Sequence, residues 1–371
     1  MNTRGKLGRR GFLARAAALE AVAPVAGGLL AACYEADKTA APGTQTSVTG
    51  PASTGTTAPE TPTSTATTEH STPTATPQPA EMTADEMDAM NEARVKAFLD
   101  NIGKTRGFPE DATFTTDGNV KVFQFTVDDV RWETEAGVVK AAIGYNSLLP
   151  GPTIRVTLGD RVRISFRNNL KESTGVHWHG IDTPNDQDGV PFVTQPPIKP
   201  GQTYTYEFEA TPAGTHMYHS HHNATDQVGR GLLGAFIVEA KDRSRYPHYD
   251  HEYVMVLNDG YNGFTINGKS FPATQPLTAK VGETLLIRYL NEGLAYHPMH
   301  LHGMPQQVYA VDGYPLPQPY LTDTVSVAPG NRYEVLVKAR ARGLWAFHCH
   351  VLSHVERPEG MFGLVTVLAI E

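Results

Sequence analysis

The feature that most constrains the fold is an internal repeat. Three segments occur twice, in the same order and with matching glycines: GDRVRISFRNNL at 159–170 and GETLLIRYLNEG at 282–293, PGQTYTYEF at 200–208 and PGNRYEVLV at 329–337, GLLGAFIV at 231–238 and GMFGLVTV at 360–367. The first pair also keeps the same distance to a histidine, because Gly159 precedes His177 by 18 residues and Gly282 precedes His300 by 18. Such self-similarity indicates two homologous domains.

Within each half, hydrophobic residues alternate with polar ones over short runs. Ile154, Val156 and Leu158 are an example, and glycine, proline and asparagine separate the runs. This period of two is typical of strands with one buried face. We therefore predict an all-β fold of two Greek-key β-sandwich or barrel domains, at 110–243 and 250–371.

The N-terminal region has the pattern of an export signal. Arg9 and Arg10 precede an alanine-rich stretch that ends in LAAC at 30–33, which resembles a twin-arginine signal with a lipoprotein cleavage site. We predict a Tat-type signal peptide at 1–32 and lipidation of Cys33, which would anchor the exported protein to the outer face of the cell membrane. The alternatives are an ordinary cleaved signal, which would give an extracellular protein, and a retained membrane helix.

Two further segments precede the domains. Residues 33–82 are rich in Thr, Ser and Pro and contain almost no large apolar side chain, which predicts a disordered tether. Thr83 and Glu86 then have the spacing of a capping box, and an approximately helical apolar stripe follows. We predict a short helix at 83–101.

The net charge and the cysteine content limit which partners the protein can bind and which cellular compartment suits it. The net charge of −8 at neutral pH disfavours nucleic acid as a partner. The chain has two cysteines, and lipidation of Cys33 would leave Cys349 as an unpaired thiol in an oxidising compartment. Metal ligation is one reason to keep such a thiol.

Histidines are concentrated in four motifs. Ten of the 15 lie in HWHG at 177–180, YHSH at 218–221, HPMHLHG at 297–303 and FHCHVLSH at 347–354. Each motif contains a His-X-His pair, whose two side chains share one face of a strand. A single pair is often a zinc site or an ordinary surface pair, but four pairs with Cys349 favour copper, because a zinc site would leave most of these ligands unused. The remaining histidines are expected to be structural or exposed: His70, His216, His222, His248 and His251.

Cys349 lies between His348 and His350, so strand alternation directs its side chain to the opposite face. A thiolate with two histidines and a weak thioether is the blue-copper arrangement. The candidates for it are Cys349, His297, His354 and Met361. The first repeat has other residues at the four equivalent positions, namely Ser220, Thr174, Thr225 and Leu232. A single blue-copper site is therefore expected, in the second domain.

At these motifs the chain resembles the multicopper oxidases, especially the two-domain laccase-like members, over roughly residues 115–371. The resemblance implies two cupredoxin-like domains and four coppers per chain, of which one is type 1, one is type 2 and two are type 3. It assigns His297, Cys349, His354 and Met361 to type 1, His177 and His300 to type 2, and His179, His219, His221, His302, His348 and His350 to type 3. It also implies that Asp188 donates protons near type 2 and that electrons pass from Cys349 through His348 and His350.

The implied reaction is one-electron oxidation of a small reducing substrate, such as a phenol, an aromatic amine or a metal ion, coupled to four-electron reduction of dioxygen to water. The resemblance also implies a homotrimer, in which the first domain of one chain faces the second domain of the next. One alternative is a copper nitrite reductase, which carries its blue copper in the first domain. Another is a non-catalytic copper-binding or electron-transfer cupredoxin, which would leave the histidine pairs unexplained.

Overall fold

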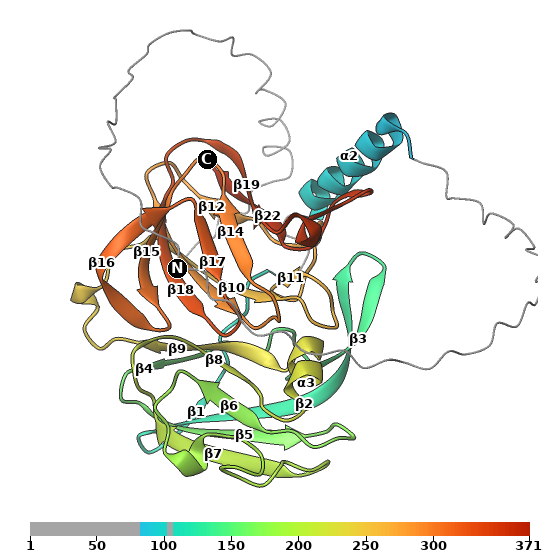
Figure 1. Cartoon of the computed structure of the whole chain (residues 1–371). Coiled ribbons are helices and arrows are strands. Elements are labelled where there is room, and N and C mark those ends of the chain that lie inside the picture. The colour runs from blue at the N-terminus through green and yellow to red at the C-terminus, as the bar shows by residue number, and fades with distance from the viewer. Residues whose placement is uncertain (1–81, 102–106) are drawn as a thin grey trace, which may run out of the picture. The chain divides into compact units, whose positions relative to one another are not determined.

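The computed structural model describes residues 82–101 and 107–371, which belong to one compact unit, Pro77–Glu371 (Figure 1). The predicted signal peptide, Cys33 and the tether as far as residue 81 lie outside the described residues. No helix in the described ranges is long and apolar enough to cross a membrane.

Helix α2 spans Ala84–Asn101 and precedes the first domain. Its capping box is formed: the Thr83 N–H donates to Oε2 of Glu86 (2.8 Å), and the Glu86 N–H donates to Oγ1 of Thr83 (3.3 Å). Near the other end, Phe98 is buried and stacks on Phe271, with ring centroids 5.1 Å apart. Phe271 belongs to the second domain, so the helix is docked on that domain.

The first domain is a β-sandwich. Its strands are β1 Thr115–Asp117, β2 Val120–Glu135, β3 Val138–Tyr145, β4 Ile154–Thr157, β5 Arg161–Asn168, β6 Val176–His179, β7 Thr203–Glu209, β8 Gly214–Ser220 and β9 Leu233–Glu239. One sheet has the order β1-β2-β5-β7, with β3 also paired to β2, and the other has the order β4-β9-β8-β6. The connections contain the short helix α3 (Ala224–Arg230) and the 3-10 turn η2 (Asn185–Gln187). Aromatic side chains fill the space between the sheets, among them Phe123, Phe166, Trp178 and Phe236.

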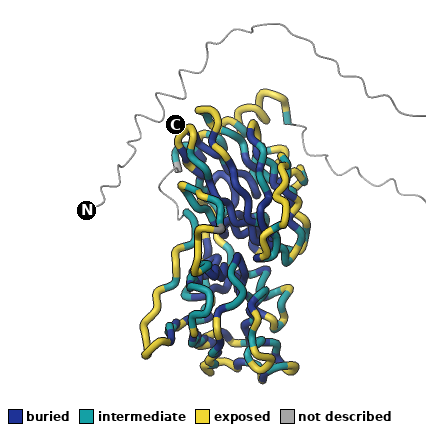
Figure 2. Tube along the Cα trace, turned by 90° about the vertical axis from the view of Figure 1, so that its left-hand side faces the viewer, coloured by how far each residue is buried: buried dark blue, intermediate teal, exposed yellow. Residues whose placement is uncertain are grey.

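The second domain repeats this architecture. Its strands are β10 His251–Asn258, β11 Thr265–Ile266, β12 Leu277–Ala279, β13 Thr284–Asn291, β14 His297–Leu301, β15 Gln306–Val311, β16 Tyr314–Thr322, β17 Thr324–Val327, β18 Arg332–Lys338, β19 Gly343–Cys349, β20 Glu356–Arg357, β21 Gly360–Met361 and β22 Val365–Ile370. The two large sheets have the orders β11-β10-β13-β18-β15-β16 and β12-β22-β19-β14-β17. The 3-10 turns are η3 (Arg243–Arg245) and η4 (Leu352–His354). Buried residues run through the interior of both sandwiches (Figure 2).

Equivalent residues make equivalent bonds in the two halves. Asn168, the last residue of β5, donates from Nδ2 to two carbonyl oxygens of later turns, each at 2.8 Å. Asn291, the last residue of β13, makes the corresponding bonds at 2.9 and 2.8 Å. Strand β2 pairs in parallel with β5, as β10 does with β13. The prediction of an all-β chain with two homologous sandwich domains is confirmed.

The two domains bury a shared apolar surface. Met217, Leu233 and Ile237 of the first domain form one cluster with Val256 and Leu290 of the second. Burial of apolar side chains stabilises by roughly 25 cal/mol per Å². This cluster therefore fixes β8, which carries His219, against the second domain.

Beside this cluster lies a buried charge network between the domains. Arg288 donates from Nη1 to Oε1 of Glu334 (2.6 Å), which also accepts from Oγ1 of Thr215 in the first domain (2.5 Å). Arg288 donates from Nε to Glu252 (2.7 Å) as well. The side chains of Arg288 and Glu334 are 7% and 4% exposed, so each charge depends on its partner rather than on water.

We expect Glu334→Ala to lower the free energy of unfolding by roughly 3 kcal/mol, because it leaves a buried guanidinium with less compensating charge. Urea denaturation followed by tryptophan fluorescence measures this. The control is Glu207→Ala, which removes ion pairs with Arg161 and Arg163 that are open to solvent and should change the midpoint little. Equal shifts in the two variants would contradict the prediction.

Candidate metal centres

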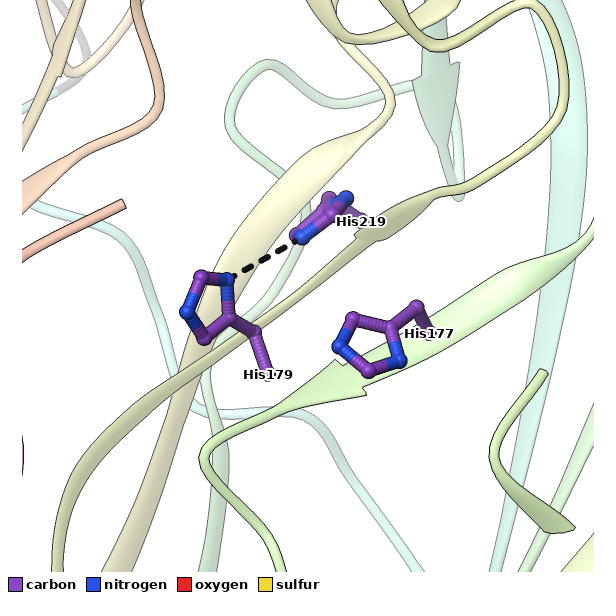
Figure 3. A group of neighbouring side chains, drawn as sticks. All are labelled: His177, His179 and His219. Atoms are coloured by element: carbon purple, nitrogen blue, oxygen red, sulfur yellow. Dashed lines mark hydrogen bonds between the residues drawn. The ribbon is translucent and has the colours of Figure 1, made fainter. Parts of the chain in front are cut away.

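Four histidines of the first domain converge on one site. His177 on β6 and His219 on β8 are paired in register, and their ring centroids are 5.4 Å apart. His179 approaches them from the same strand face as His177, with its Nδ1 3.3 Å from Nε2 of His219 (Figure 3). Ligand atoms of these three lie within 4.8 Å of one another. His221 completes this first quartet, with its ring 5.5 Å from that of His177.

Four histidines of the second domain form an equivalent quartet. His300 on β14 and His348 on β19 are paired in register, and their ring centroids are 5.8 Å apart. His302 lies with Nε2 3.1 Å from Nε2 of His348. The ring of His350 is 5.7 Å from that of His300. Among the described residues, no group of ligand atoms within 4.8 Å combines the two quartets.

Backbone carbonyls orient the rings in both quartets. Nδ1 of His219 lies 2.9 Å from the oxygen of Ser220, and Nδ1 of His348 lies 2.8 Å from that of Cys349. Nδ1 of His177 lies 2.9 Å from the carbonyl oxygen of Asp188. A carbonyl oxygen only accepts, so Nδ1 carries the proton in each case and Nε2 has the lone pair that can bind a metal.

Burial keeps two histidines of the first quartet neutral. Burial, reinforced by the positive charge of Arg332, lowers the pKa of His179 to about 3. Burial likewise lowers the pKa of His219 to about 4. A neutral imidazole is the form that binds a metal ion, so both rings are in the ligating state at neutral pH.

Cys349 and two histidines form a separate buried site. Sγ of Cys349 lies 3.8 Å from Nδ1 of His297 and 3.7 Å from Nδ1 of His354. All three residues are buried, and Nε2 of His297 has no hydrogen-bond partner. Burial raises the pKa of the Cys349 thiol to about 11, so a metal would have to displace its proton. One soft sulfur and two imidazole nitrogens suit copper, and the site fits it on donor chemistry.

The structure places the remaining predicted residues as follows. Met361 lies on β21, partly buried against the second-domain core that contains Cys349. Asp188 follows η2, and its Oδ1 is 3.3 Å from Nδ1 of His177. Its side chain is 32% exposed, so it contacts both a quartet histidine and solvent.

Three residues beside these sites belong to none of the histidine motifs. Asp259 accepts the N–H of Ala295 at 2.9 Å and lies 3.8 Å from Nε2 of His297. Phe264 stacks on the His354 ring, with centroids 4.2 Å apart, and covers it. Glu292 lines a cavity of about 350 Å³ beside the first quartet, and burial raises the pKa of its carboxyl well above the usual range. An aspartate before glycine indicates only a turn, so no sequence pattern predicts that Asp259 lies beside a metal site.

Comparison with known proteins identifies the family. Two multicopper oxidase domain models match residues 126–243 and 246–369. The blue copper oxidase of Nitrosomonas europaea superposes with a TM-score of 0.64 at 33% identity, over 67% of this chain and 85% of that one. This chain belongs to the multicopper oxidase family. The predicted resemblance is therefore confirmed, and membership implies that the chain binds copper.

Other multicopper oxidases resemble this chain to a similar degree. The structure of the multicopper oxidase mgLAC has a TM-score of 0.64 at 36% identity, over 67% of this chain and 86% of that one. Laccase-2 of Botryotinia fuckeliana is 32% identical over 274 residues, which are 62% of this chain and 46% of the laccase. Copper resistance protein A of Pseudomonas syringae pv. tomato is 41% identical over 120 residues, 32% of this chain and 19% of that protein. This chain thus spans less than half the length of the curated relatives it matches.

Proposed function

We propose that this multicopper oxidase oxidises a small reducing substrate one electron at a time and reduces dioxygen to water. Its proposed four coppers are type 1 at Cys349, His297, His354 and Met361, type 2 at His177 and His300, and a type 3 pair at His179, His219, His221, His302, His348 and His350. The main support for the proposal is the placement of Cys349. Its thiol faces two buried imidazoles, while its chain neighbours His348 and His350 belong to the second quartet.

Bound copper would accept and store single electrons at these sites and bind dioxygen. The chain supplies the connection between the sites, since peptide bonds join Cys349, the last residue of β19, covalently to His348 and His350. The carbonyl oxygen of Cys349 also accepts a hydrogen bond from Nδ1 of His348. This bond gives a second, shorter path for electrons from Cys349 to the quartet.

Asp188 is proposed to move protons at the oxygen-reducing site. Its Oδ1 lies within reach of Nδ1 of His177, while a third of its side chain contacts solvent. A carboxyl in this position can exchange protons with water and pass them toward the quartet.

The first domain has no second set of type 1 ligands at the equivalent positions, which supports a single type 1 site in the second domain. At the position equivalent to Cys349, Ser220 donates from Oγ to Oε1 of the buried Gln227 (2.6 Å). Thr174, equivalent to His297, donates to the same oxygen (2.9 Å). Hydrogen bonds thus fill the place of the metal, which disfavours a nitrite reductase with type 1 copper in this domain. The two quartets similarly disfavour a one-copper carrier.

The separation of the two quartets supports a ring of three copies, in which each first-domain quartet meets the second-domain quartet of the next copy. A head-to-tail contact of this kind closes into a ring of three copies when each copy is rotated by about 120° relative to the last. Phe192 and Val193, a few residues beyond Asp188, are each 78% exposed. Apolar side chains so exposed at the edge of a site are typical of an interface.

We expect Phe192→Asp to convert the trimer to monomers, because a carboxylate would be desolvated in the interface. Light scattering coupled to size-exclusion chromatography measures the mass. Tyr261→Asp, at a residue that is also exposed, is the matched control and should leave a trimer. A wild-type monomer at micromolar concentration would refute the ring.

We base the proposed substrates on the similar proteins and the proposed location of the protein on its N-terminal sequence. A laccase and the iron transport multicopper oxidase FET5 of Saccharomyces cerevisiae are both similar to the chain, so phenols, aromatic amines and metal ions are the proposed substrates. Export through the twin-arginine route and a lipid on Cys33 are also proposed, and the mass of the mature N-terminal peptide tests them.

Dioxygen uptake tests the proposed reaction. With a phenol as donor, four substrate electrons should be consumed per dioxygen in a stirred oxygen-electrode cell, and added catalase should release no oxygen. Peroxide as the main product, or no uptake with phenols, aromatic amines and ferrous ion, would refute it.

A further inference from the structure

Helix α2 contacts the segment that carries Met361. The Met361 N–H donates to Oδ1 of Asn91 (3.4 Å), and its carbonyl oxygen accepts from Nε of Arg94 (2.5 Å). Both polar groups of this one backbone unit are therefore bonded to the helix. Otherwise β21 is held by the two-residue ladder with β20, where Met361 pairs with Glu356.

Arg94 ties the helix to both domains. Its Nη2 donates to Oε2 of Glu135 (2.9 Å), at the end of β2 in the first domain, and to the carbonyl oxygen of Phe271 in the second (2.7 Å). The side chains of Arg94 and Glu135 are 17% and 14% exposed. A planar guanidinium that makes three bonds to fixed partners has little freedom to move.

The packing around these bonds is close. Gly360 has φ +98°, and a Cβ there would lie 2.7 to 2.9 Å from atoms of Asn91. A side chain at this position would push the helix away from β21. At the other end of the contact, Phe98 stacks on Phe271. The helix is thus also anchored four residues beyond Arg94.

We propose that helix α2 is a positioning element for the type 1 site, in which Arg94 and Asn91 fix the Met361 backbone and thereby the distance of its thioether from the metal. This inference rests on the proposed role of Met361 as axial ligand. A weak axial thioether tunes a blue-copper site through its distance, so small displacements of the backbone change the spectrum and the potential. Arg94 acts through Met361 and is a positioning residue.

The first test uses the metal-free protein and does not depend on copper. In Arg94→Ala, amide hydrogen exchange over residues 356–363 should be roughly tenfold faster than in wild type, as expected when bonds to a charged group are lost. Lys96→Ala removes an exposed cation from the same helix and should leave exchange unchanged. Asn91→Ala removes one bond and keeps the Arg94 network, so it should give a smaller effect of the same sign.

The second test uses copper-loaded protein. Arg94→Ala should shift the visible thiolate-to-copper absorption and the EPR splitting in the direction that Met361→Leu shifts them, while Lys96→Ala should match wild type. Faster exchange with an unchanged spectrum would overturn the proposal, as would unchanged exchange in both Arg94→Ala and Asn91→Ala. A wild-type protein without the blue absorption would instead refute the type 1 assignment, and the exchange result would still report whether the helix fixes the segment.

Discussion

Replacing Cys349 by serine is expected to lower turnover of a phenol by at least about a thousandfold, the scale on which loss of one member of a catalytic unit acts. A serine hydroxyl does not ionise at neutral pH and is a poor ligand for copper, so the type 1 site would be lost. Steady-state oxidation under air measures the rate, and the visible spectrum should lose its intense blue band.

The two quartets provide the control for this variant. His348, the quartet residue next to Cys349 on β19, points to the other face of that strand, and the first-domain quartet lies on β6 and β8. A serine is accommodated at the equivalent position of the first domain, Ser220. Cys349→Ser should therefore fold and lose about one copper per chain while it keeps the others. Retention of the blue band in the variant would contradict the assignment of Cys349.

Asp188→Asn is expected to lower kcat by about a hundredfold, within the range for removal of a general acid. The amide keeps the size of the side chain and leaves the carbonyl bond to His177 intact, but it cannot donate a proton as a carboxylic acid does. Dioxygen consumption at saturating substrate measures the loss. Anaerobic reduction of the blue band by substrate should proceed at the wild-type rate.

Asp323 offers a matched control for Asp188. Its carbonyl oxygen also holds a quartet histidine, at 3.1 Å from Nδ1 of His300. If only the hydrogen bond from the histidine to the aspartate carbonyl oxygen matters, Asp188→Asn and Asp323→Asn should have the same activity. We expect Asp323→Asn to change kcat by less than about twofold, and an equal loss in both variants would contradict a proton-transfer role for the Asp188 carboxyl.

Strand periodicity was sufficient to predict much of the candidate site. Alternation along 348–350 predicts that Cys349 points away from its neighbours, and the structure has Cys349 buried in the core with His350 exposed. The repeat likewise predicts that the two histidine quartets are equivalent, because a duplicated strand keeps its register. Both inferences need only local geometry, which the residue pattern determines.

Contacts between distant segments could not be predicted in this way. Arg94 and Met361 are 267 residues apart, and no pattern along the chain links them. Gln227 fills the first-domain site from the short helix α3, which has no periodic signal of its own. The repeat does not align Asp323 with Asp188, because Asp323 lies 23 residues after its histidine and Asp188 lies 11 after its own.

We propose that one chain supplies ligands for four coppers. The most direct test is the copper content of the fully loaded wild-type protein by mass spectrometry, measured together with its EPR spectrum. We expect close to four coppers per chain, with about half of them EPR-silent because the type 3 pair is coupled. One copper per chain, all of it detected by EPR, would contradict the oxidase assignment and indicate an electron carrier.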